Sequence, residues 1–207
     1  MTTAARERRR SVMRDDILTA TLGLIEDGGL GAATIESIAE RAGVARATVY
    51  AHFPDGRDEM LRAAYDRAGR MLLDLARARV AAFDAWEERI EEYARTMIEF
   101  SSGGALGRFY SVSGPALVGF REGGGAGSRG YREAIGAELA AARERGELSA
   151  DADPESLAVL LSSSLRDAGI AAARDPESAE RFVRAIRCLL DGLKTARHGE
   201  AGQHGRR

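Results

Sequence analysis

The chain has 207 residues, of which 44% are hydrophobic and 30% are charged. This balance is typical of a folded globular protein, and the length allows one or two domains. Thirty basic and 32 acidic side chains give a formal net charge of −2, so any contact with nucleic acid must come from a local patch and not from the overall charge.

Several classes of protein are excluded by features that the sequence lacks. A single cysteine, Cys188, rules out an intramolecular disulfide and a cysteine-based zinc cluster. Its apolar neighbours predict a buried structural thiol, with a redox-sensing thiol as the alternative. No apolar run reaches the roughly 18 residues of a membrane span. The basic start is followed by Asp15 and Asp16 and not by the apolar core of a signal peptide. We therefore expect a cytoplasmic protein with no metal, no cofactor and no membrane partner.

The spacing of apolar residues predicts an all-α protein. Only four prolines occur, and no segment alternates between apolar and polar residues as a half-buried strand does. The first helix is predicted over residues 13–26 and ends at a glycine pair. A short second helix is capped by Thr34 and ends at Gly43, and a third ends at the turn of residues 54–56.

Longer helices are predicted after Arg57. In the first two of these, apolar residues recur at helical spacing and mark one buried face each. A glycine-rich segment over residues 121–130 predicts a flexible loop, and residues 111–115 are expected to loosen or kink the helix before it. A further helix begins at Tyr131 and ends near Gly146. The predicted buried positions are Leu61, Ala64, Tyr65, Ala68, Leu72 and Leu75 in the first long helix, and Trp86, Ile90, Tyr93, Met97 and Phe100 in the second.

The tetrapeptide Asp-Pro-Glu-Ser occurs twice, at residues 153–156 and 175–178. Aspartate caps a helix, and proline suits the first helical position because its missing N–H has no partner there. Each copy therefore predicts the start of a helix with one inward face. The inward positions are Leu157, Leu160, Leu161, Ser164, Leu165 and Ala168 after the first copy, and Phe182, Ile186, Leu189, Leu190 and Leu193 after the second.

Two short helices joined by a tight turn are predicted within residues 34–53. Gly43 supplies the positive φ that such a turn needs, and Val49 anchors the second of the two helices on the core. The polar side chains of that helix are left on the outside, where a guanidinium can bind guanine bidentately and hydroxyls can donate to phosphate. The alternative is a plain helical hairpin with a polar outer face. The outward residues are Arg46, Thr48, Tyr50 and His52.

Residues 16–61 resemble the DNA-binding domain of the TetR-type (tetracycline-repressor-like) transcriptional regulators. The resemblance lies in the order and spacing of many short motifs, and beyond these residues only the length and the helical pattern are similar. The matching motifs are Ile17-Leu18, Leu22, Leu24-Ile25, Gly28-Gly29-Leu30, Thr34-Ile35, Ile38-Ala39, Ala42-Gly43-Val44, Thr48-Val49-Tyr50 and His52-Phe53-Pro54.

The resemblance implies a homodimer that places the third helix of each subunit in the major groove of double-stranded DNA. The chain departs from the family pattern after the His-Phe-Pro turn, where a lysine is common and Arg57 is the expected substitute. Ala45 stands where a capping serine or threonine is frequent. By position, the expected DNA contacts are Thr34, Ala45, Arg46, Ala47, Thr48, Tyr50, His52 and Arg57.

The start of the chain is strongly basic, although residues 1–57 hold eight arginines and eight acids. Two interpretations of this arm are open. It lies along the DNA backbone or in the minor groove, or it is a disordered and solvated terminus. The charges that give the arm a net +4 are Arg6, Arg8, Arg9, Arg10 and Arg14 against Glu7.

The resemblance also implies an effector pocket among the long helices and a dimer interface from the last two. From the residues alone, the aromatic and methionine side chains form either a ligand wall or a plain core. The last two helices form a four-helix bundle between subunits or pack on their own domain. The candidate pocket residues are Trp86, Tyr93, Met97, Phe100, Phe109, Tyr110 and Phe120. The candidate interface residues are Leu157, Leu161, Leu165, Phe182, Ile186, Leu189 and Leu193.

The sequence does not support an enzymatic function. The three histidines form no metal-binding pair on a helix, and no nucleotide-binding or nucleophile motif is present. The acidic run at Glu87, Glu88, Glu91 and Glu92 is typical of a solvated helix face.

These observations predict three segments. Residues 1–56 form an arm and a helix-turn-helix DNA-binding domain, residues 57–198 form a helical domain for effector binding and dimerisation, and residues 199–207 form a disordered tail. The predicted function is a ligand-responsive transcriptional regulator, a repressor released from a palindromic operator by a small apolar or aromatic effector. The alternative is a helical protein that binds a small molecule and does not bind DNA.

Overall fold

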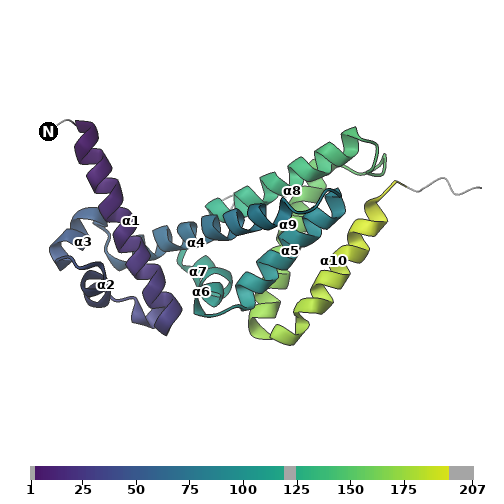
Figure 1. Ribbon diagram of the computed structural model, residues 1–207. Helices are drawn as coiled ribbons and strands as arrows, with labels where there is room; N and C mark the ends of the chain where they lie inside the picture. Colours follow the sequence, from purple (N-terminus) through teal and green to yellow (C-terminus); the bar gives the residue numbers. More distant parts are fainter. Residues whose placement is uncertain (1–2, 119–124, 196–207) are drawn as a thin grey trace, which may run out of the picture.

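The structure is a computed structural model that describes residues 3–118 and 125–195. These residues form an all-α molecule (Figure 1), and their one extended pairing is a bridge between Leu148 and Lys194. None of the helices in the described part of the chain is both long and apolar enough to cross a bilayer. The helices are α1 (Thr3–Gly28), α2 (Ile35–Ala42), α3 (Arg46–His52), α4 (Arg57–Val80), α5 (Trp86–Ser102), α6 (Ala105–Arg108), α7 (Gly114–Val118), α8 (Ala126–Glu144), α9 (Pro154–Arg174) and α10 (Ala179–Leu193), with short helical turns at Leu30–Ala32, Phe109–Ser113 and Pro176–Ser178.

The first three helices form a small unit at one end of the molecule (Figure 1). α1 begins ten residues earlier than the sequence predicted, at Thr3 and not at Met13. Arginine, alanine and glutamate favour helix, and the segment before Met13 contains neither glycine nor proline to stop it. The arm is therefore an exposed helical extension of α1 and not a disordered terminus. Its first turns project past the rest of the small unit.

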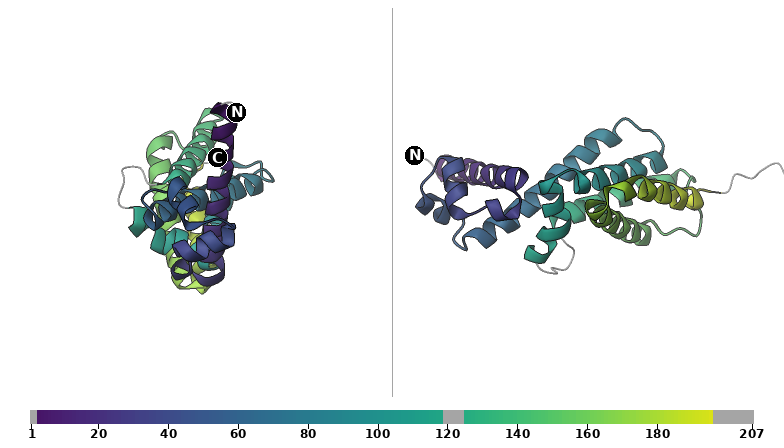
Figure 2. Two further views of the ribbon diagram at one scale, coloured as in Figure 1. Left: turned by 90° about the vertical axis from the view of Figure 1, so that its left-hand side faces the viewer. Right: turned by 90° about the horizontal axis from the view of Figure 1, so that it is seen from below.

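α4 joins the small unit to the larger group of helices (Figure 2). Its first turns pack on α1, and its later turns pack on α5 and α8. One continuous apolar core runs from Ile17 in α1 through Leu61 and Leu72 in α4 to Leu190 in α10. The predicted domain boundary after residue 56 falls at the start of α4. Because α4 belongs to both packing groups, that boundary stays a prediction.

α5 lies among α4, α8, α9 and α10. The predicted inward faces of α4 and α5 are confirmed at nearly every position, because helical spacing and apolar character agree there. Leu75 is the exception, with 41% of its surface exposed, and Phe100 is half-buried. As expected, the segment after Arg108 is loosened, and Phe109–Ser113 form a π-helical turn.

α8 begins at Ala126, inside the segment predicted as a flexible loop. Glycine there serves close packing: a Cβ on Gly127 would lie 2.6 Å from the Cα of Gly69 in α4. The α4 and α8 backbones can approach this closely only because both positions lack a side chain. Residues 121–124 of the predicted loop lie outside the described part of the chain, as does the predicted tail at 199–207.

The two Asp-Pro-Glu-Ser copies adopt different structures. Asp153 caps α9 as predicted, accepting a 3.0 Å hydrogen bond from the amide of Ser156. Asp175 makes no such bond: its own amide donates to Ala171 at the end of α9, and its carboxylate lies 3.4 Å from Arg181. The second copy forms a 3₁₀ turn, and α10 begins one residue after it. The prediction that each copy caps a helix is wrong for the second.

Cys188 is exposed, against the prediction of a buried thiol. The buried stripe of α10 consists of Val183, Ile186 and Leu190. Position 188 lies two residues from Ile186, about 200° around the helix, so its side chain points away from the core.

Candidate functional site

The helix-turn-helix is formed by local capping and a glycine turn. Thr34 accepts a 3.1 Å hydrogen bond from the amide of Ser37 and so caps α2 as predicted. Gly43 ends α2 with φ of 68°, and the amide of Val44 donates back to Ala39. This left-handed turn directs the chain into α3 at a fixed angle. Ala45 precedes α3 without a side-chain cap, as expected for alanine.

α3 is held on the core by Val49 and by Phe53, which follows its last turn; both are fully buried. Its outer surface carries Arg46 and Tyr50, the latter 49% exposed. Thr48 and His52 are half-buried at the edges of this surface, and Ala45 and Ala47 are exposed beside it. The structure therefore presents a guanidinium, a phenol and a threonine hydroxyl on one short helix.

His52 faces partly inward. Its Nδ1 is buried without a hydrogen-bond partner in the described part of the chain. Burial and the charges of Arg10 and Arg14 lower the pKa of His52 below its ordinary value. The imidazole is therefore neutral at pH 7 and offers a hydrogen bond, not a positive charge.

Arg57 has a structural task in addition to the one predicted for it. Its Nε donates to the carbonyl of Ala33 at 2.7 Å, and its Nη2 donates to the carbonyl of Leu30 at 2.9 Å. The side chain thereby ties the start of α4 to the connection between α1 and α2. A role for Arg57 in binding phosphate stays a prediction.

Contacts at the middle and at the C-terminal end of α1 link the small unit to the rest of the molecule. At the middle, Arg67 of α4 donates to the carbonyl of Asp15 at 2.9 Å. Near the C-terminal end, the carboxylate of Glu26 accepts a 3.0 Å hydrogen bond from the amide of Leu106 in α6. Because α6 leads directly into the π-helical turn, the orientation of α1 is tied to that turn.

The aromatic residues predicted as a pocket lie mostly in the core. Tyr110 stacks on Tyr65 with 5.1 Å between ring centroids, and the edge of Phe100 meets Tyr110 at 5.9 Å. Phe109 meets Tyr65 edge to face. These four side chains form one cluster between α4, α5 and the π-helical turn. Tyr65, which the sequence assigned only to the core, is its central member.

Tyr93 belongs to a second aromatic contact, with Tyr131 of α8 at 5.5 Å. Burial raises the pKa of both Tyr110 and Tyr131, so both are neutral phenols. The Tyr131 hydroxyl is buried without a partner in the described part of the chain. Met97 is also buried, and Phe120 lies outside the described residues. Trp86, although buried itself, borders an open groove far from this cluster, lined also by Asp84, Glu87, Arg145, Glu147 and Lys194.

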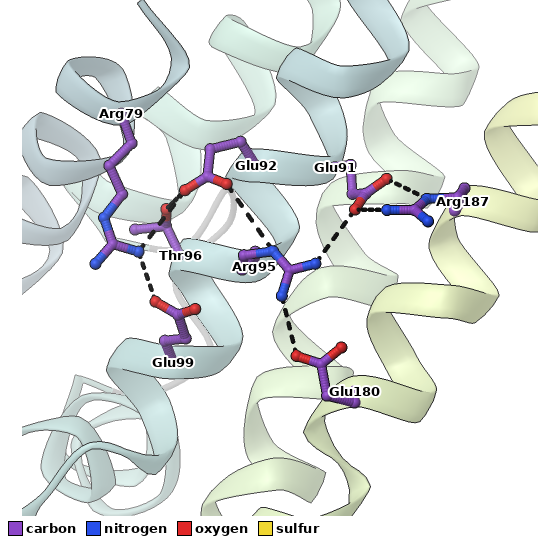
Figure 3. A network of polar contacts seen from close by, with 8 residues as sticks. All are labelled: Arg79, Glu91, Glu92, Arg95, Thr96, Glu99, Glu180 and Arg187. Atoms are coloured by element: carbon purple, nitrogen blue, oxygen red, sulfur yellow. Dashed lines mark hydrogen bonds and ion pairs between the residues drawn. The ribbon is translucent and has the colours of Figure 1, made fainter. Parts of the chain in front are cut away.

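Three residues of the acidic run are paired: Glu87 lies 2.8 Å from Lys194, and Figure 3 shows the partners of Glu91 and Glu92. Glu91 accepts two hydrogen bonds from Arg187 of α10, at 2.7 and 2.5 Å, and one from Arg95. Glu92 is buried and lies 3.7 Å from Arg79 of α4. The prediction of a solvated face is wrong at Glu87, Glu91 and Glu92, because α4, α10 and the residue after α10 cover that side of α5, whereas Glu88 is exposed. The network fixes α10 against α5.

The candidate interface residues divide into two groups. Leu161, Leu165 and Ile186 are buried within their own subunit. For these three, burial favours the alternative of packing on their own domain. Leu189 is 56% exposed, whereas Leu157, Phe182 and Leu193 are half-buried. Leu160, predicted to face inward, is 63% exposed and adds to the outer apolar surface of α9.

The comparisons with known proteins agree with this geometry. Residues 17–64 match the family model "Bacterial regulatory proteins, tetR family". A TetR-family transcriptional regulator from Pectobacterium atrosepticum has a similar structure, with a TM-score of 0.78, 21% identity, and coverage of 94% of this chain and 98% of that chain. No protein with a curated description is matched by sequence.

Two further similar structures are a complex with a small-molecule ligand and a receptor for a small molecule. RolR in complex with resorcinol gives a TM-score of 0.68 at 18% identity, covering 88% of this chain and 89% of that chain. A gamma-butyrolactone receptor, an ArpA-like protein, gives 0.59 at 21% identity and 91% coverage of both chains. At these identities the likeness shows the fold. The matched family model adds that the N-terminal domain of this chain is that of the tetR family of bacterial regulatory proteins.

Proposed function

We propose that the protein is a ligand-responsive transcriptional regulator that binds double-stranded DNA through α3. The observation that carries this proposal is the exposed pair Arg46 and Tyr50 on a short helix fixed by a glycine turn. A guanidinium can read guanine O6 and N7 in the major groove, and a phenol can donate to a phosphate oxygen. The family to which this domain belongs supports the same assignment.

The regulator acts as a homodimer through the outer faces of α9 and α10. Leu160 and Leu189 are large apolar side chains left mostly exposed on these two helices. Pairing α9 and α10 with their copies in a second subunit would cover them in a four-helix bundle. Two-fold symmetry then presents two copies of α3 to a palindromic operator, with half-sites roughly 34–36 Å apart or a multiple of this.

The effector is a small apolar or aromatic molecule, and it releases the repressor from DNA. The aromatic cluster around Tyr65 and Tyr110 offers flat apolar surfaces with phenolic groups. A protein of the same fold binds resorcinol, which is itself a small aromatic molecule with hydroxyl groups. Tyr65 is part of α4, whose start directly follows α3. A tilt of α4 therefore changes the separation of the two α3 helices, and both can no longer dock at once.

Selection of DNA from a pool of random duplexes, in the presence of nonspecific competitor, tests this proposal. We expect the wild type to enrich a palindrome and the variant Arg46→Ala/Tyr50→Ala to bind it at least about 30-fold more weakly, since the dimer loses the base contact of Arg46 in both half-sites and each such contact is worth about 1–3 kcal/mol. Both side chains are exposed, so the thermal midpoint of the variant should stay close to that of the wild type. A wild type that enriches no sequence would instead favour the alternative of a protein that binds a small molecule without DNA.

A further inference from the structure

The start of α3 is joined to the start of α2 by an ion pair that the sequence pattern did not indicate. Arg46 is the only arginine or lysine in α3. Its Nη1 donates to Oε1 of Glu36 at 3.0 Å, and both side chains are about two-thirds exposed, at 66% and 65%. Two contacts lower the pKa of Glu36. The larger effect comes from a backbone hydrogen bond in the first turn of α2, and the smaller one comes from the hydrogen bond with Arg46. Glu36 is therefore ionised at neutral pH.

The contact leaves Arg46 able to bind a base. A guanidinium has five N–H donors in a planar fork, and the bond to Glu36 uses Nη1. The opposite edge can still donate two parallel hydrogen bonds to guanine. In water such an exposed pair contributes little to stability. Inside a DNA interface, where water is displaced, the same charge-assisted bond becomes stronger and more directional.

We propose that Glu36 is a positioning residue that aims Arg46 at a guanine and so narrows the base preference at one operator position. This inference rests on the proposed function. The carboxylate also has a second, opposite effect, because it repels the phosphates of any DNA. Glu36 therefore lowers affinity for all sequences while it raises selectivity for one base.

The effects on affinity and on base selectivity distinguish a positioning role of Glu36 from a role in supporting the fold only. In the variant Glu36→Ala, we expect nonspecific affinity to rise about three- to ten-fold and the preference for guanine at the Arg46 position to fall roughly five-fold. Glu36→Gln keeps an acceptor for Arg46 without the charge, so it should raise affinity and retain most of the preference. In an Arg46→Ala background, Glu36→Ala should change the base preference no further.

The experiment is enrichment from a random duplex pool, sequenced for each variant, with thermal unfolding measured beside it. Asp27→Ala is the matched control, because Asp27 forms a similar exposed pair with Arg41 at 2.5 Å on the α1 side of α2. This control should change neither the base preference nor the nonspecific affinity. If the wild type enriches a palindrome and Glu36→Ala shows the same base preference, the inference about Glu36 is overturned but the proposed function is not. A wild type that enriches nothing would overturn the proposed function and the inference with it.

Discussion

At the scale of single residues, Arg14 shows how α3 is held in place. Its guanidinium lies over the ring of Phe53, 3.9 Å from the centroid, and donates to the carbonyl of His52. It also pairs with Glu59 of α4 at 3.0 Å. One side chain of α1 therefore joins the end of α3 to the start of α4. The sequence grouped Arg14 with the basic arm, because a charge count does not reveal a long-range partner.

We expect Arg14→Ala to lower the free energy of unfolding by about 1–2 kcal/mol, since it removes a cation–π contact and two partly exposed polar contacts. Arg8→Ala, on the exposed part of α1, is the control and should be nearly neutral. Urea unfolding followed by circular dichroism measures both. Equal stability of the two variants would show that the Arg14 contacts do not hold α3.

His52 should make stability depend on pH in a defined range. Its pKa in the folded state is lowered from 6.5, so below about pH 6.5 the unfolded chain binds more protons than the folded one. Stability contributed by the neutral imidazole is therefore present above that pH and is lost as the pH falls toward the lowered value. We expect His52→Asn to gain stability relative to the wild type below about pH 6.5, with a constant difference above about pH 7. Urea unfolding across this range would refute the assignment if the difference did not change with pH.

At the scale of elements, local signals predicted the fold well where one feature decided the structure. Thr34, Gly43 and Asp153 act as the caps and turn that the sequence indicated. The failures occur where a second element intervenes. Asp175 ends α9 and turns its carboxylate to Arg181 without capping the next helix, and Glu91 is covered by Arg187, a residue 96 positions away in the sequence. No periodicity within one segment carries that information.

The same distinction applies to the candidate site: features set within one helix could be predicted, and contacts between helices could not. The outward face of α3 followed from its buried face, so Arg46 and Tyr50 could be placed from the pattern alone. The partner of Arg46 could not, because its contact with Glu36 depends on the crossing of α2 and α3. The pocket residues share helical spacing with the core, and spacing does not distinguish a ligand wall from packing.

The repeated tetrapeptide gives a matched pair of variants at this scale. Asp153→Ala removes the cap of α9 and should lower the free energy of unfolding by about 1 kcal/mol. Asp175→Ala removes only an exposed ion pair, in which Oδ2 of Asp175 lies 3.4 Å from Nη2 of Arg181. It should change the free energy of unfolding by less than about 0.5 kcal/mol. Differential scanning calorimetry of both variants makes the comparison. A larger loss for Asp175→Ala would contradict the difference between the two turns.

At the scale of the whole molecule, the proposed function depends on two subunits acting together. The apolar outer faces of α9 and α10 lie in the part of the molecule away from α3 (Figure 1). A dimer built on them leaves both copies of α3 accessible, while α4 couples each copy to the aromatic cluster. The −2 net charge does not oppose DNA binding in this arrangement, because contact is confined to one end of each subunit.

We expect Leu160→Glu/Leu189→Glu to convert a dimer to a folded monomer, because a buried charge without a partner strongly disfavours association. Leu75→Glu is the control: Leu75 is also exposed, at 41%, but lies on α4. Light scattering coupled to size-exclusion chromatography gives the mass, and circular dichroism confirms the helices. A double variant that remains dimeric would place the interface elsewhere.

The most direct test of the account is a footprint of the purified protein on the DNA upstream of its own gene, at moderate salt and with nonspecific competitor. We predict a protected palindrome whose two half-sites lie about one helical turn apart or a multiple of this, with protection lost in Arg46→Ala/Tyr50→Ala. Protection that survives in the double variant would contradict recognition through α3. If neither this DNA nor any selected duplex is protected by the wild type, the protein does not act as a DNA-binding regulator.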